Sequence, residues 1–92
     1  MSGQEPIDVS IEPTPNPNSM KFTLNRKLAE KSETYADRQQ AEKSPLAKTL
    51  LQIPGVKTLF VLNNFISVGK DVAADWEEIV PKVERSLREF FK

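Results

Sequence analysis

Apolar residues recur at steps of three and four through the last part of the chain, and this pattern constrains the fold most. They are Trp76, Ile79, Val80, Val83, Leu87, Phe90 and Phe91. Such spacing lines one face of an α-helix, which must be buried. Asp75, with Glu78 three positions later, resembles a capping box at its start. Pro81 removes one backbone hydrogen bond, so we expect a kink there or a separate first turn.

A second helix is predicted from residue 44 to residue 53. Ser44 can cap it, and Pro45 suits the first helical position, where a backbone N–H has no partner in any case. Its buried side would consist of Leu46, Leu50, Leu51 and Ile53. The pair Pro54-Gly55 should end it, since proline breaks a helix and glycine permits the turn that follows.

The remaining patterned segments are typical of β-strands. Residues 7–11 and 20–24 alternate apolar and polar side chains, as half-buried strands do. Residues 56–63 and 65–70 predict a hairpin that turns at Asn63-Asn64. The unbroken apolar run 59–62 indicates a strand inside the sheet. Residues 33–37 form a weaker strand candidate, residues 25–31 are ambiguous, and residues 37–43 are expected to be loop.

These elements predict an α+β fold. In a two-layer sandwich, two helices would cover one face of a mainly antiparallel sheet and leave the other face exposed. The 92 residues suffice for one domain. We expect residues 1–6 to form a flexible N-terminal tail and residues 7–92 to form the single domain.

The chain contains no cysteine and no histidine. It therefore has neither a thiolate nucleophile nor the side chain that most often performs acid–base catalysis near neutral pH. Thiolate-ligated clusters and structural zinc sites are also excluded within this chain. We expect no catalytic residue, no bound cofactor and no enzymatic activity.

Charge and hydropathy argue against two further classes of protein, those that bind nucleic acid and those that bind membranes. Lys and Arg total 13, as do Asp and Glu, so the formal net charge is +0. A nucleic-acid-binding domain normally has a basic surplus. No apolar run could span a bilayer, and the polar face of the last helix mixes acids and bases. We expect no membrane partner, no nucleic-acid partner and a cytoplasmic location.

Three prolines at alternate positions, 13, 15 and 17, make the segment before residue 20 a stiff, extended loop. One interpretation is a preorganised recognition loop, because rigid segments lose little entropy on binding. The candidate partner-binding residues are Thr14, Asn16, Asn18, Ser19 and Lys21. The alternative is a connection between two strands whose Asn side chains bond to their own backbone.

Two charged clusters have weaker claims to function. Four carboxylates, from Asp71, Asp75, Glu77 and Glu78, could offer oxygen ligands to a divalent ion such as Fe²⁺. Acidic residues also favour helix N-termini for the helix dipole alone, which is the more ordinary interpretation. A basic cluster of Lys21, Arg26, Lys27 and Lys31 could meet an acidic partner, or it could be a solvated surface.

Several motifs in order resemble the N-terminal domain of Nfu-type iron–sulfur scaffold proteins. The first is the run Thr14–Phe22. The others are Ser44-Pro45-Leu46-Ala47 with Leu50 and Leu51, Ile53-Pro54-Gly55-Val56, Leu59-Phe60, Phe65-Ile66-Ser67-Val68, Asp75-Trp76, Pro81 and Phe90-Phe91. The resemblance covers nearly the whole chain from residue 7.

The resemblance implies a context in iron–sulfur cluster assembly or delivery. Two-domain Nfu proteins hold their cluster with a Cys-x-x-Cys pair in a separate C-terminal domain, and this chain has no cysteine. It is therefore expected to act as an accessory module that binds iron–sulfur assembly proteins, a Cys-x-x-Cys carrier or client apoproteins. The alternatives are an oxygen-ligand iron-binding protein and a general protein-interaction domain unrelated to clusters.

Overall fold

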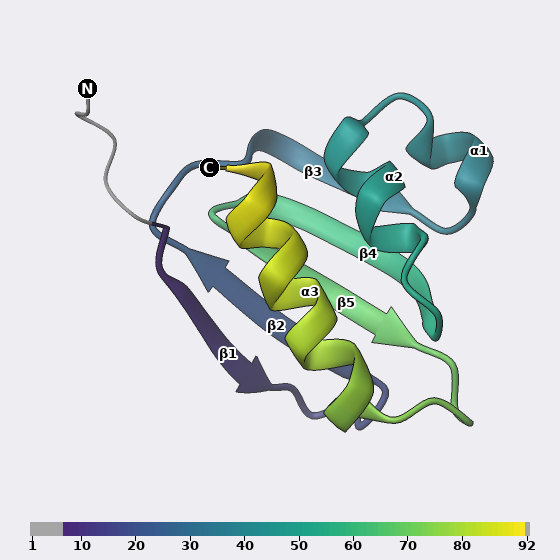
Figure 1. The fold of residues 1–92 in the computed structure, drawn as a ribbon. Helices are drawn as coiled ribbons and strands as arrows, with labels where there is room; N and C mark the ends of the chain where they lie inside the picture. Colours follow the sequence, from purple (N-terminus) through teal and green to yellow (C-terminus); the bar gives the residue numbers. More distant parts are fainter. Residues whose placement is uncertain (1–6, 92) are drawn as a thin grey trace.

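A computed structural model describes residues 7–91, so the expected tail at residues 1–6 lies outside the described residues. Within them, strands form one antiparallel sheet in the order β1-β2-β5-β4-β3 (Figure 1). The strands are β1 (Val9–Pro13), β2 (Ser19–Leu24), β3 (Ala29–Tyr35), β4 (Val56–Asn63) and β5 (Phe65–Lys70). The helices are α1 (Arg38–Ala41), α2 (Pro45–Leu51) and α3 (Trp76–Phe90). The predicted two-layer α+β fold is confirmed.

The core lies between the sheet and the helices α2 and α3, which pack on the same face (Figure 1). The largest fully buried side chains come from both layers. They are Phe22, Leu50, Leu59, Ile66, Val68, Ile79, Val83 and Leu87. Because these strands alternate buried with more exposed residues, their opposite face is left without a helical cover.

The helix starts follow the predicted capping chemistry. The Ser44 hydroxyl accepts the backbone N–H of Ala47, and Pro45 is the first residue of α2. The Asp75 carboxylate accepts the N–H of Glu77 at the start of α3. A kink or a separate first turn was expected at Pro81. The separate turn was wrong, since α3 runs through that residue without interruption, and the kink stays a prediction.

One loop prediction was also wrong. Residues 37–43 include the short helix α1, in which the Asp37 carboxylate caps the N–H of Gln40 and the Gln40 side chain accepts the N–H of Ala36. Ala41 is fully buried at its end. A helix of four residues is too short to show apolar periodicity, so only the Asp37 cap could have indicated it.

The strand β3 begins at Ala29, within the segment left ambiguous by the sequence. Its register against β4 shifts between Ala29 and Glu33. Such a bulge breaks the alternation of side chains, which explains the weak strand pattern there. The hairpin turn was correctly placed, because Asn63 has a left-handed φ of 52° and Leu62 pairs with Phe65.

The N-terminal segment contacts both ends of α3. At the start of the helix, the indole N–H of Trp76 donates to the Pro17 carbonyl oxygen at 2.9 Å. At its last turn, the Arg88 guanidinium donates to the Ile7 carbonyl oxygen at 3.0 Å. At 1.5 Å rise per residue these contacts are about 18 Å apart along the helix. The indole N–H of Trp76 therefore has its hydrogen-bond acceptor in the proline-rich loop.

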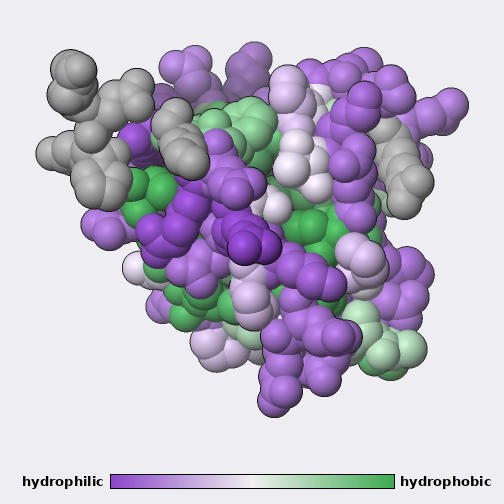
Figure 2. Space-filling view, viewed as in Figure 1, coloured by the Kyte–Doolittle hydropathy of each residue, from purple (hydrophilic) through white to green (hydrophobic). Residues whose placement is uncertain are grey.

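The side of the molecule that carries the helices is mostly hydrophilic, with apolar surface in small separate areas (Figure 2). Among the described residues, the exposed large apolar side chains are Val72 and Phe90. None of the described helices has the length and apolar character required to cross a bilayer.

Candidate functional site

One side of the sheet is not covered by any of the described helices (Figure 1). Residues that pair across antiparallel strands share a face, so the register identifies its members. We call this surface the open face. It comprises Ser10, Glu12, Ser19, Lys21, Thr23, Thr34, Thr58, Phe60, Leu62, Phe65, Ser67 and Gly69.

An aromatic cluster lies near the middle of the open face. The rings of Phe60 and Phe65, from neighbouring strands, are 6.1 Å apart and tilted by 42°. The Lys21 ammonium lies 4.7 Å above the ring of Phe65, within the range of a cation–π contact. Both rings and Leu62 are only partly buried. Partly exposed aromatic side chains in a polar surround are typical of protein interfaces.

The proline-rich loop at one end of this face is held by its own polar side chains. The Thr14 hydroxyl lies 3.0 Å from the carbonyl oxygen of Asn16 and 3.1 Å from that of Ser19, and it accepts the N–H of Asn16. The Asn16 side chain accepts the N–H of Asn18. These bonds explain why short Thr and Asn side chains alternate with prolines here.

The loop is also tied to β5 and α3. The backbone N–H of Lys70 donates to the Asn18 carbonyl at 2.9 Å, and its ammonium donates to the Asn18 amide oxygen at 3.2 Å. The same ammonium lies 5.8 Å from the ring of Trp76, which bonds to Pro17. Residues from three distant parts of the chain therefore keep the loop in place.

A shallow depression of about 300 Å³ lies where the loop meets the open face. Side chains from the loop and from β3, β4 and β5 line it. They are Asn16, Asn18, Ser19, Thr34, Lys57, Thr58, Leu59, Phe60, Ser67, Gly69 and Lys70. The hydroxyls of Ser19 and Ser67 are hydrogen-bonded to each other at 3.0 Å. Polar groups with one aromatic wall can recognise a polar side chain of a ligand.

The five predicted site residues divide into two groups. Ser19 and Lys21 belong to the open face, and Asn16, Asn18 and Ser19 line the depression. Thr14 instead stabilises the loop from within. Their role in partner binding stays a prediction.

Sequence reasoning did not name Lys57, Thr58, Phe60, Ser67 or Lys70 as site residues, although they line the depression. The alternation of side chains in the predicted hairpin 56–70 could have assigned several of them to an exposed face.

Two of the four carboxylates considered as metal ligands have local structural roles, and the other two, from Glu77 and Glu78, belong to the first turn of α3. Asp75 caps α3, and Asp71 accepts the N–H of Ala73 while its second oxygen lies 3.9 Å from the Lys57 ammonium. In the part of the chain that the structure describes, no three acidic side chains are grouped to hold a metal ion.

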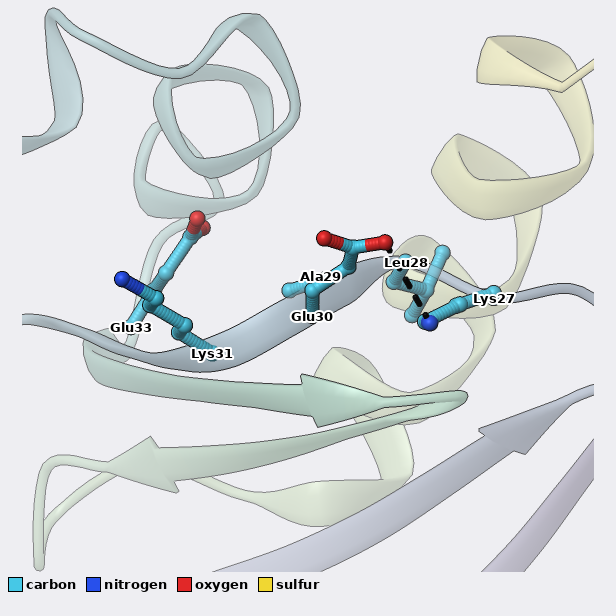
Figure 3. A pocket seen from close by; sticks show the side chains of 6 residues that line it. All are labelled: Lys27, Leu28, Ala29, Glu30, Lys31 and Glu33. Atoms are coloured by element: carbon cyan, nitrogen blue, oxygen red, sulfur yellow. Dashed lines mark ion pairs between the residues drawn. The ribbon is translucent and has the colours of Figure 1, made fainter.

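The basic cluster considered above is divided between different surroundings. Lys21 lies on the open face, whereas Arg26 lies 5.9 Å from the ring of Phe91. Lys27 forms an ion pair with Glu30 at 3.6 Å beside a hollow of about 520 Å³ along β3 (Figure 3). That hollow is lined by Lys27, Leu28, Ala29, Glu30, Lys31 and Glu33. Its two lysines and two glutamates balance, so it favours neither an anion nor a cation.

Comparison with known proteins identifies the fold family. Residues 9–92 match the family described as "Scaffold protein Nfu/NifU N terminal". The chain belongs to this family. The resemblance inferred from its motifs is therefore confirmed, and the family is one of scaffold domains rather than a known class of enzymes.

Similar proteins include longer chains. The NFU1 iron-sulfur cluster scaffold homolog of Drosophila persimilis is 34% identical over 91 residues, which cover 97% of this chain and 32% of that protein. The solution structure of a NifU-like protein from Saccharomyces cerevisiae has a TM-score of 0.83 at 30% identity, covering 97% of this chain and 82% of that one. A crystal structure from Staphylococcus aureus has a TM-score of 0.74 at 38% identity, covering 86% and 96%. The chain spans about a third of the length of the Drosophila relative. These relatives relate the chain to iron–sulfur cluster biology.

Proposed function

We propose that this domain is an accessory module in iron–sulfur cluster assembly or delivery, which binds a cluster-carrying protein or a client apoprotein and holds no cluster itself. The observation that carries the proposal is the match to the Nfu/NifU N-terminal family over residues 9–92 in a chain with no cysteine. Cluster ligation in proteins relies chiefly on cysteine thiolates, so the cluster has to be held by the partner.

The open face is the contact surface we assign to that partner. Phe60, Leu62 and Phe65 supply partly exposed apolar area, and Lys21 with the neighbouring serines and threonines supplies a polar surround. Aromatic residues inside a polar rim are the usual arrangement at a protein interface. The rigid loop beside them adds contacts at little entropic cost.

The alternative of an oxygen-ligand iron-binding protein has less support. Of the carboxylates that motivated it, Asp75 caps α3 and Asp71 interacts with Ala73 and Lys57. The described residues group no three acidic side chains around a metal position. A calorimetric titration with ferrous iron under anaerobic conditions tests it directly, since saturable binding would favour this alternative.

A backbone NMR titration tests the proposed function. The ¹⁵N-labelled domain is mixed with a Cys-x-x-Cys Nfu-type carrier from the same cell, first without its cluster and then loaded. Shifts at amides of the open face and of residues 14–21, stronger with the loaded carrier, are expected. If no shift occurs at high concentration, the carrier is not a direct partner, and a general interaction role becomes the better proposal.

Two phenylalanine variants identify the surface in the same experiment. Phe60→Ala removes an aromatic side chain from the open face, and Phe90→Ala is its control, since Phe90 is exposed at the end of α3. If Phe60 is an anchor worth about 2 kcal/mol, its truncation weakens binding about thirty-fold while the control changes it little. If Phe90→Ala weakened binding more than Phe60→Ala, the interface would lie at the end of α3 instead.

A further inference from the structure

The charged groups that line the depression beside the loop are all of one sign. The described residues that line it carry two ammonium groups, from Lys57 and Lys70, and no carboxylate. Hydroxyl groups of Ser19, Thr34, Thr58 and Ser67 lie in the same lining. The whole chain is neutral, so this separation of charge is local.

Both lysines have donor capacity to spare. The Lys70 ammonium donates to two neutral oxygens, the Asn18 amide oxygen and the Asp71 carbonyl, at 3.2 and 3.3 Å, and an ammonium has three N–H groups. The Lys57 ammonium lies 3.9 Å from an Asp71 oxygen, and both side chains are about half exposed or more. An exposed pair at that distance contributes little, so a ligand anion can replace it.

The aromatic wall of the depression is apolar but poorly suited to nucleobases. Stacking of successive bases needs several free ring faces, but Phe60 is the one aromatic residue among the described residues that line the depression, and its neighbour Phe65 has the Lys21 ammonium over one ring face. The rings of Phe60 and Phe65 are tilted by 42°, so they form no common plane for successive bases. A peptide needs neither feature, because its apolar side chains can pack against a tilted ring.

We propose that this depression binds an acidic peptide segment of a partner protein, with a carboxylate between Lys57 and Lys70 and an adjacent apolar side chain against Phe60. This proposal rests on the proposed function, because it specifies the chemical class of the partner segment that binds beside the open face. Electrostatic complementarity of this kind sets specificity and the rate of encounter. Lys70 also bonds to Asn18 and lies near Trp76, so an occupied depression should perturb the loop.

The test uses a blocked hexapeptide of alternating glutamate and leucine, titrated into the ¹⁵N-labelled protein. Saturable shifts are expected at the amides of Thr58, Ser67 and Gly69 and at the indole N–H of Trp76, the chain's one tryptophan. Lys57→Gln should weaken binding about five-fold, the upper end of what an exposed ion pair contributes. Lys48→Gln, an exposed lysine on α2, is its control and should have no effect.

Removing the Asp71 carboxylate, which competes with the peptide for Lys57, should strengthen peptide binding. Asp71→Asn keeps an oxygen to accept the Ala73 N–H but frees Lys57, so the peptide should bind about two-fold more tightly. Glu42→Gln removes the same charge from the exposed segment between α1 and α2 and should leave affinity unchanged. Equal effects of these two variants would mean that only net charge matters, and would overturn the proposal.

Two other results would overturn it. One is equal binding of a glutamine–leucine hexapeptide, which has the same apolar side chains without carboxylates. The other is tighter binding of an oligouridine octamer at the same amides, which would assign the depression to nucleic acid. The two titrations use different ligands, so their outcomes are independent. If the peptide does not bind, the proposed binding of a carrier at the open face is unaffected. If the carrier does not bind, a positive peptide titration still supports the acidic-peptide site.

Discussion

At the scale of single residues, Gly69 on the open face lies opposite Thr58 and has no space for a side chain. A Cβ atom at position 69 would be only 2.1 Å from the Thr58 hydroxyl oxygen. Gly69→Ala should therefore destabilise the fold by about 1–3 kcal/mol, as overpacking does. Urea denaturation followed by circular dichroism measures this cost.

A double-mutant cycle supplies the control for that contact. Thr58→Ala removes the hydroxyl and leaves the Thr58 Cβ position, 3.5 Å from the added Cβ, at ordinary contact distance. The pair Thr58→Ala with Gly69→Ala should thus be more stable than Gly69→Ala alone. A double variant as unstable as the single one would show that the cost has another source, such as the lost freedom of glycine.

The single tyrosine couples stability to alkaline pH. Burial is the main cause that raises the pKa of Tyr35 above its ordinary value of 10.0, and the hydrogen bond to Glu33 adds to it. A raised folded-state pKa means that the folded chain holds this proton more tightly. The stabilisation is therefore complete below the unfolded pKa and is lost as pH rises through the folded pKa.

Tyr35→Phe tests this dependence. The natural chain should lose more stability than the variant when the pH is raised from about 8 to 11, because only the natural chain has the tyrosine proton to lose. Urea midpoints across that range, together with the absorbance titration of the one tyrosine, measure it. Parallel pH profiles for the two proteins would contradict the assignment.

At the scale of elements, α3 organises the loop that borders the open face. Trp76→Phe keeps the aromatic packing but removes the N–H that donates to Pro17. Loss of one hydrogen bond should cost about 0.5–1.5 kcal/mol. Amide exchange should accelerate at Asn18 and Ser19 while β3 and β4 stay unaffected, and unchanged exchange in the loop would mean that the prolines alone hold it.

Elements with complete local chemistry could be predicted from the sequence. Both longer helices have a capping residue followed by apolar periodicity, and the β4–β5 hairpin has Asn63 at a position that requires positive φ. The helix α1 and the start of β3 could not be predicted, since one is a single turn and the other contains a bulge. Each lacks the period on which such predictions depend.

The candidate site was only partly predictable for a different reason. The loop residues Asn16, Asn18 and Ser19 are adjacent in sequence and were named together. Lys57 and Lys70 meet them only through strand pairing, in which Ser19 lies opposite Gly69 and Gly69 opposite Thr58. Sheet register depends on packing of the entire core, which a single sequence does not reveal.

At the scale of the whole molecule, no strand within residues 7–91 pairs with the outer edge of β1. The backbone N–H of Leu24 donates to the Asn64 carbonyl oxygen and therefore points away from β1. Val9, which pairs with Leu24, consequently makes no backbone hydrogen bond to β2, and its N–H and C=O point out of the sheet edge. The same holds for every second residue of β1, which means Ile11 and Pro13. Pro13 has no N–H to offer there, which weakens the edge as a template for another strand.

Pro13→Val should restore that donor and promote pairing of two β1 edges. Sedimentation velocity over a range of concentrations measures the change, and the expected result is a shift toward dimer relative to the natural chain. Pro15→Val is the matched control, since Pro15 is exposed outside the strands. If both variants or neither associate more strongly, Pro13 has no special role at the edge.

The contact between Arg88 and Ile7 has a consequence for how the domain can be joined to others. It brings the first described residue beside the last turn of α3, so the two ends of the described part of the chain lie at the same end of the helix. The proline-rich loop and Lys70 lie near Trp76, about 18 Å away along the helix. A further folded unit joined close to residue 7 or to residue 91 would thus start far from the depression and leave it accessible.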